Sequence, residues 1–139
     1  MSPTITIAFA GDVMLGRLVD QAISQMGYDH PWGDLLPALQ EADLFLINLE
    51  TTLTSQTRPA DPGKAFNFRA EPTAAEALNI GGVDFASVSN NHILDFGAAG
   101  LQDTLAVLEG AGIAHAGAGP DLVSAQRHVI LTADGSCAG

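Results

Sequence analysis

The stretch VDFASVSNNHILDFG, residues 83–97, joins an apolar, strand-like segment to a cluster of polar side chains. The strand-like segment 83–88 leads to Asn90, Asn91 and His92, and Asp95 follows three residues after the histidine. Side chains of these types can bind a metal ion or transfer a proton. The chain therefore places reactive groups at the point where a strand is expected to end.

Two earlier segments end in the same way. Residues 5–10 predict a buried strand that stops at Gly11 and Asp12, and residues 44–49 predict an apolar strand that ends at Glu50. Helical spacing between these strands predicts an α/β protein with a parallel or mixed sheet whose faces are covered by helices. Ligands of such sheets bind beyond the carboxyl ends of the strands, so Asp12, Glu50 and the Asn-Asn-His group should meet there.

The other elements are expected from periodicity and from turn residues. Helices are expected at residues 15–26, 33–42, 73–79, 98–110 and 121–126. Further strands are expected at residues 65–69, 85–88, 113–116 and 128–132, with a polar loop at residues 51–63. A chain of 139 residues fits a single domain.

The polar side chains at the three strand ends suit a metal site. Carboxylate and amide oxygens with an imidazole are ligands for Mn²⁺, Mg²⁺, Fe²⁺ or Zn²⁺. Each residue alone also has a structural interpretation: Asp12 as a helix cap, Glu50 as a solvated carboxylate, the two asparagines as turn formers, and His92 as a structural histidine. Their recurrence at equivalent strand ends favours the functional interpretation.

The charge balance excludes some classes of partner. Sixteen acidic residues against five scattered basic residues give a net charge of −11, which argues against nucleic acid and anionic membranes. No signal peptide begins the sequence, and no apolar run reaches the ~18 residues of a membrane span, so a cytoplasmic location is the default. Cys137 is the only cysteine, which excludes an intrachain disulfide.

The segment GDVMLGR, residues 11–17, has the glycine spacing of a phosphate-binding loop. Arg17 stands at the position of the lysine, and Leu18 stands at the position of the hydroxyl residue that binds magnesium. Asp12 would also face a phosphate inside such a loop. These differences argue against a nucleoside triphosphatase.

Four motifs resemble the CapA family of bacterial capsule-synthesis proteins, also called the poly-gamma-glutamate synthesis family. They are FAGDVMLGR (9–17), INLETTLT (47–54), FNFRAEP (66–72) and NNHILDFG (90–97), and the resemblance extends from about residue 5 to residue 119. That family is similar in fold to the calcineurin-like metallophosphoesterases. The resemblance implies half of a layered α/β sandwich, with a metal site, dinuclear in the wider superfamily, at strand ends.

The resemblance also implies a role for each candidate residue. Asp12 matches a metal ligand after the first strand, Glu50 stands where the superfamily has a bridging aspartate, and Asn91 matches an asparagine ligand. His92 matches a catalytic histidine, and Asp95 would orient it from one helical turn away.

This sequence departs from the superfamily pattern in its histidines. Met14 replaces a histidine ligand, and a thioether is a poor ligand for hard ions. His30, His115 and His128 are expected to be structural. The chain is therefore expected to be the N-terminal half of a family member, truncated at its C-terminus, that self-associates or needs the missing half.

Two classes of function stay open. The first is a metal-dependent hydrolase or transferase that acts on a phosphoester or on a polyanionic polymer such as poly-gamma-glutamate. The second is a non-catalytic structural or partner subunit of a capsule synthesis or export machine. The superfamily also draws histidine ligands from a motif in its second half, and this chain has no such motif. These missing histidine ligands are the feature that separates the two classes, and metal binding is the property to measure.

Overall fold

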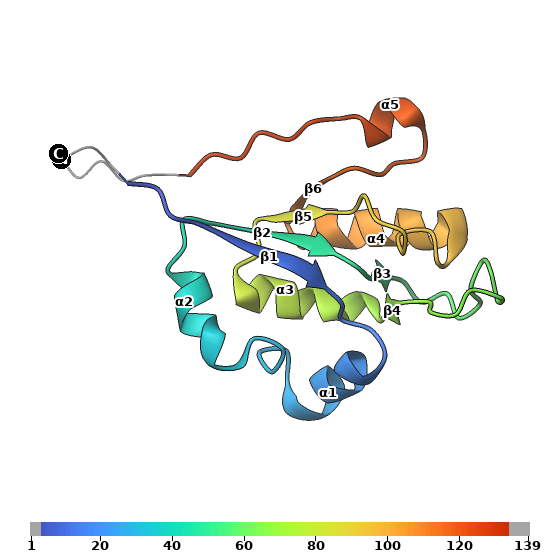
Figure 1. Cartoon of the computed structure of the whole chain (residues 1–139), viewed down its shortest axis with the longest axis horizontal. Helices are drawn as coiled ribbons and strands as arrows, with labels where there is room; N and C mark the ends of the chain where they lie inside the picture. Colours follow the sequence, from blue (N-terminus) through green and yellow to red (C-terminus); the bar gives the residue numbers. More distant parts are fainter. Residues whose placement is uncertain (1–3, 134–139) are drawn as a thin grey trace.

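The structure is a computed structural model that describes residues 4–133. The expectation for Cys137 lies outside these residues. Four strands form one sheet in the order β1-β2-β5-β6, and all neighbouring strands are parallel, as expected (Figure 1). The strands are β1 (Ile7–Val13), β2 (Leu44–Leu49), β5 (Phe85–Ser87) and β6 (Ala114–Ala116).

Helices connect the parallel strands, close to the predicted positions. The connecting helices are α1 (Leu18–Met26), η1 (Gly33–Leu35), α2 (Leu36–Gln40), η2 (Pro72–Ala74), α3 (Ala75–Gly81) and α4 (Gly97–Gly110), and α5 (Leu122–Ala125) follows β6. Of the helices within residues 4–133, none has both the length and the apolar character needed to cross a membrane.

One face of the sheet is buried against helices. Phe45 and Ile47 of β2 and Ala86 of β5 are exposed by 3% or less. They belong to one core cluster with Leu78 of α3 and Leu108 of α4. Ile47 and Ala86 are partners in register, so their side chains point to the same side of the sheet. This face supplies the hydrophobic core that fixes the positions of the strand ends.

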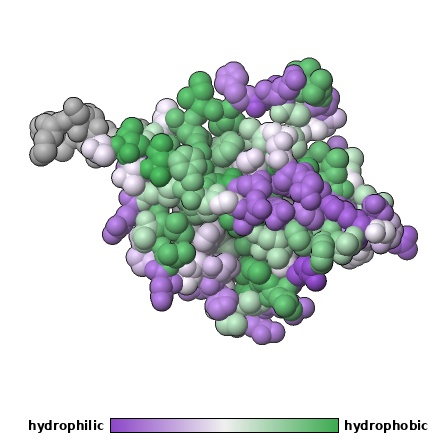
Figure 2. Space-filling view, in the orientation of Figure 1, coloured by the Kyte–Doolittle hydropathy of each residue, from purple (hydrophilic) through white to green (hydrophobic). Residues whose placement is uncertain are grey.

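The opposite face of the sheet is open. Ile7 and Phe9 of β1 are 45% and 74% exposed, and their register partners Leu44 and Leu46 are only half-buried. Figure 2 shows hydrophobic surface gathered over the strands, next to a hydrophilic band near their carboxyl ends. The expectation that helices cover both faces is therefore wrong for the described residues, because α3 and α4 both contribute to the core on the other side.

β1 extends past the point where the sequence predicts its end. Its register with β2 shifts between Phe9 and Asp12, and pairing then resumes with Asp12 beside Asn48 and Val13 beside Leu49. An irregularity of this kind changes the direction of the side chains that follow it. Here it allows Asp12 to pair with Asn48 at the carboxyl end of the sheet.

A second, two-stranded sheet lies beyond the end of β2. β3 (Thr52–Leu53) pairs in parallel with β4 (Arg69–Ala70). β3 falls in the segment 51–63, where the sequence predicts a loop, and the strand expected at residues 65–69 is reduced to β4. Strands of two residues leave no periodic pattern that sequence analysis could detect.

Two further expectations are wrong in detail. α1 begins at Leu18 rather than at residue 15, because residues 16–19 form a turn in which the Val19 amide donates to the Gly16 carbonyl (3.1 Å). Residues 128–132 are not a strand, because β6 is the last strand of the sheet in the described part of the chain and no strand pairs with them.

The two faces of the sheet predict opposite responses to the same substitution. We expect Phe45→Ala to lower the free energy of unfolding by about 3–5 kcal/mol, because the side chain is 1% exposed and leaves a cavity. Phe9→Ala should change it by about 0.5 kcal/mol or less and should reduce self-association, since Phe9 is exposed. Denaturant unfolding and light scattering measure both effects. Equal losses of stability would contradict the assignment of the buried face.

Candidate functional site

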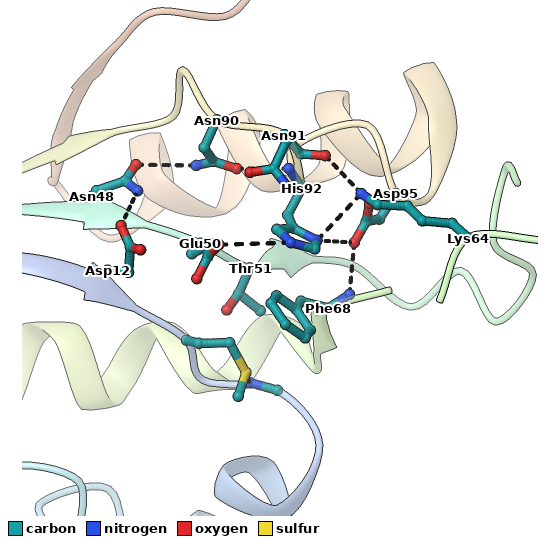
Figure 3. Close-up of polar contacts among 12 residues, drawn as sticks. Asp12, Asn48, Glu50, Thr51, Lys64, Phe68, Asn90, Asn91, His92 and Asp95 are labelled. Carbon is teal, nitrogen blue, oxygen red and sulfur yellow. Dashed lines mark hydrogen bonds and ion pairs between the residues drawn. The ribbon is translucent and has the colours of Figure 1, made fainter. Parts of the chain in front are cut away.

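A row of side-chain hydrogen bonds crosses the carboxyl ends of the strands (Figure 3). Asn48, in β2, donates from Nδ2 to Oδ1 of Asp12 over 2.7 Å. Asn90, which follows β5, donates from Nδ2 to Oδ1 of Asn48 over 3.1 Å and to the Leu49 carbonyl over 2.9 Å. The row holds together the ends of three strands, so the expected convergence of Asp12 with the Asn-Asn-His segment is present.

The imidazole of His92 is buried and held in one orientation. Its Nδ1 lies 2.7 Å from Oδ2 of Asp95. The ring of Phe68 stacks on it with a centroid separation of 4.0 Å and an angle of 23° between the planes. Because an ionised carboxylate only accepts hydrogen bonds, Nδ1 carries a proton, and Nε2 is the nitrogen left to exchange one.

Asp95 accepts hydrogen bonds from three residues in two segments of the chain. It is 3% exposed and accepts from Nζ of Lys64, from Nδ1 of His92 and from the Phe68 amide, the last over 2.7 Å. Lys64 also donates to the Asn91 carbonyl over 2.7 Å. Burial raises the pKa of Asp95, but the hydrogen bonds from Lys64, His92 and Phe68 together outweigh it, so the pKa lies below its ordinary value. The carboxylate is therefore ionised at neutral pH.

Glu50 faces the other side of the imidazole. Its Oε1 lies 3.6 Å from Nε2 of His92, which is longer than a hydrogen bond. The Glu50 amide donates to the Val13 carbonyl (3.0 Å), which keeps the residue beside the end of β1. Within residues 4–133, neither Glu50 nor Asp12 forms an ion pair with a lysine or arginine. Two carboxylates that pair with no lysine or arginine of the described residues therefore lie at this edge of the sheet.

The structure places the two asparagines differently. The side chain of Asn90 enters the hydrogen-bonded row, whereas Asn91 is exposed and contacts Lys64 through its main-chain carbonyl. Residues 4–133 contain no group of three or more His, Cys, Asp or Glu side chains that could hold a metal ion. The role of Asn91 as a metal ligand, with Asp12 and Glu50, stays a prediction.

Lys64 and Phe68 are members of the site that the sequence did not predict. In the sequence, Lys64 is one of five scattered basic residues, and Phe68 is one residue of the family-like motif FNFRAEP. The aromatic residues Phe66 and Phe68 were the available signal, because they alternate in a segment that is otherwise polar and rich in turn residues. Their function depends on contacts with residues 90–95, which no local pattern reveals.

The fold and the site together define a class of protein. A parallel α/β sheet holds acidic and amide side chains and a histidine–aspartate pair at its carboxyl edge, where such sheets bind their ligands. The family model described as "Bacterial capsule synthesis protein PGA_cap" matches residues 6–138. The chain belongs to this family of bacterial capsule synthesis proteins, which confirms the resemblance of its motifs.

Three relatives show how much of the family's length the chain covers. A probable polyglutamine synthesis accessory protein of Mycobacterium tuberculosis is 37% identical over 92% of this chain and 42% of its own length. The capsule biosynthesis protein CapA of Bacillus anthracis is 26% identical over 94% of this chain and 32% of its own length. The PGA biosynthesis protein CapA of Bacillus subtilis is 26% identical over 90% of this chain and 33% of its own length. The chain thus spans about two fifths, or less, of the length of these relatives.

The lowered pKa of Asp95 predicts a loss of stability in acid. Because the pKa is lower in the folded chain than in the unfolded chain, the contribution of Asp95 is fully present above the unfolded value of about 4. This contribution to stability is lost as the pH falls below about 4 and through the lower pKa that Asp95 has in the folded chain. Denaturant unfolding at a series of pH values should show this dependence in the parent chain.

The matched variants isolate the contribution of Asp95. Asp95→Asn should weaken the dependence of stability on pH below about pH 4, whereas Asp34→Asn, at an exposed position, should leave it unchanged. An Asp95→Asn chain whose stability falls in acid as steeply as that of the parent would show that other carboxylates cause the effect.

Proposed function

We propose that this chain contributes a metal-dependent phosphoester-cleaving site to the synthesis of capsule or poly-gamma-glutamate. The arrangement that supports the proposal is the pair of carboxylates, Asp12 and Glu50, beside an imidazole that Asp95 orients. The two relatives from Bacillus are named capsule biosynthesis and PGA biosynthesis proteins. We assign this chain to the same process on the basis of family membership.

The donor atoms at the strand ends fit a divalent ion. Among the described contacts, Asp12 receives one hydrogen bond, from Asn48, and Glu50 has only His92 as an ionisable neighbour. Carboxylate and amide oxygens of this kind suit Mn²⁺, Mg²⁺, Fe²⁺ or Zn²⁺. Asp12, Glu50 and Asn91 would hold the ion, which when bound would activate a water molecule and neutralise charge on a phosphoester oxygen. A second ion would need ligands beyond those described here.

His92 is the residue of this chain that we assign to proton transfer. With Nδ1 directed at Asp95, a protonated imidazole presents its second proton at Nε2, on the side of Glu50. Nε2 would donate that proton to the leaving oxygen of a phosphoester, and Nδ1 would keep its own. The ionised Asp95 holds the ring in this orientation, and the stacked Phe68 shields one face of the ring from water.

A non-catalytic accessory role is the second candidate function. The absence of a group of three His, Cys, Asp or Glu side chains among residues 4–133 favours it. The relative from Mycobacterium tuberculosis is also named an accessory protein. In this case the strand-end carboxylates would serve the local structure, and substitution of Asp12 or Glu50 would leave metal binding unchanged.

Metal titration separates the two candidates. We expect the chain to bind Mn²⁺ weakly, because few ligands are present, and we expect Asp12→Asn or Glu50→Gln to lower the affinity by about tenfold or more. Glu76→Gln, which removes an exposed carboxylate of α3, is the control and should have no effect. Calorimetry measures each affinity. An equal effect of Glu76→Gln would mean that Mn²⁺ binds only the acidic surface in general.

The roles of Asn91 and His92 predict different responses in two assays. Asn91→Ala should reduce Mn²⁺ affinity, whereas His92→Ala should leave the affinity unchanged and lower the hydrolysis of an aryl phosphate, since an amide oxygen ligates but does not donate a catalytic proton. Turnover by this chain alone should be close to background, so single-turnover conditions are required. Equal loss of metal in both variants would make His92 a ligand rather than the acid.

A further inference from the structure

The backbone at Arg17 has a conformation that normally requires glycine. Its φ of 59° and ψ of −125°, with the hydrogen bond from the Val19 amide to the Gly16 carbonyl (3.1 Å), are those of the first central residue in a type II′ turn. Arg17 is the one non-glycine residue with a positive φ among residues 4–133. A side chain at this position is strained, so an arginine there needs a reason beyond the turn itself.

Contacts of the two preceding residues hold the turn in place. The Leu15 amide donates to Oγ1 of Thr51 over 2.8 Å, and Leu15 is 1% exposed. A Cβ atom on Gly16 would lie 2.5 Å from the Arg69 carbonyl oxygen, so the turn packs directly on β4. These contacts fix the segment between β1 and α1 beside Thr51, the residue that follows Glu50.

A series of aromatic contacts leads from Arg17 to the imidazole of His92. The guanidinium carbon of Arg17 lies 5.2 Å from the ring centroid of Phe66. Phe66 lies 6.4 Å from Phe68, and Phe68 lies 4.0 Å from His92, both measured between ring centroids. Because Phe66 is 55% exposed, Arg17 stacks on a ring at the surface rather than in the core. Stacking occupies one face of a guanidinium and leaves its N–H donors free in the plane.

Two other basic side chains, Lys64 and Arg69, already have hydrogen-bond partners. Lys64 donates to Asp95 and to the Asn91 carbonyl. Arg69 donates to the Thr54 carbonyl and to Glu71, each over 2.7 Å. Within residues 4–133, Arg17 has no ion pair with a carboxylate. Of these three basic side chains, Arg17 is therefore the one whose guanidinium keeps its donors for a ligand.

We propose that Arg17 binds an oxyanion of the ligand, a phosphate or a carboxylate group, at the rim of the Asp12–Glu50–His92 site. This inference rests on the proposed function, because it names Arg17 as a protein residue that holds the substrate of that site. An arginine fork matches the two oxygens of either anion. Phe66 contacts the guanidinium, and the strained turn keeps Arg17 beside this ring.

Titration with two probes tests the proposal on the full chain. Inorganic phosphate and a γ-linked glutamate oligomer are added separately at low salt, with EDTA present, and binding is followed by NMR. We expect Arg17→Gly to weaken binding by about tenfold or more, the effect of losing charge-assisted hydrogen bonds. It should also raise Tm by roughly 3 °C or more, because glycine relieves the strain. Phe66→Ala should weaken binding by a smaller factor.

Arg127→Gly is the matched control, since it removes an exposed arginine at a position without a positive φ. It should change binding of either probe by less than twofold and should not raise Tm. Binding of phosphate alone would identify a phosphoester group, and binding of the oligomer alone would identify a polymer carboxylate. Both results support the proposal if Arg17→Gly removes the binding.

Three results would overturn the inference about Arg17. They are a parent chain that binds neither probe, an Arg17→Gly chain that binds as the parent does, and an Arg127→Gly chain that loses as much affinity. Because EDTA removes divalent ions, the result does not depend on the metal. If the chain binds no Mn²⁺ but Arg17→Gly still weakens anion binding, the metal site is rejected and the inference about Arg17 stands.

Discussion

The buried Asp95 carboxylate is the contact on which the site depends. Lys64 and Phe68 reach it from the segment between β3 and β4, and His92 reaches it from the turn after β5. The Ala60 amide also donates to the Asp95 main-chain carbonyl over 2.8 Å. Two segments that share no regular secondary structure are therefore held together through one residue. The charge that Lys64 supplies keeps the carboxylate ionised, and an ionised carboxylate fixes the imidazole tautomer.

The parts of the fold that sequence analysis predicted depend on local patterns. β2 was predicted with its observed bounds, because LFLINL is a continuous apolar run that ends at a charged residue. α4 agrees with its prediction to one residue. The convergence of Asp12 with the Asn-Asn-His segment followed from topology alone, since the carboxyl ends of parallel strands lie at one edge. The contact of His92 with Asp95 followed from their spacing.

The features that the sequence did not predict depend on tertiary contacts. The open face of β1 is one example: Ile7 and Phe9 are as apolar as the buried Phe45, and only the placement of α3 and α4 on one side distinguishes them. Lys64 is another, because an isolated lysine in a polar loop has no pattern that connects it to Asp95. The third example is the asparagine pair. Asn90, and not Asn91, joins the hydrogen-bonded row, because the direction of the chain after β5 decides which side chain faces Asn48.

The distribution of charge explains how an acidic chain can present a basic group to an anion. The net charge of −11 acts over the whole surface, but salt screens it beyond about 8–10 Å. Within that distance, the ligand would meet the particular groups at the strand ends. Lys64 is paired with Asp95. Among the described residues, Asp12 and Glu50 then have no lysine or arginine partner, and Arg17 has no acidic partner. Separation of these opposite charges by the rings of Phe66 and Phe68 costs stability that direct ion pairs would provide. A site that binds a cation on one side and an oxyanion on the other requires such a separation.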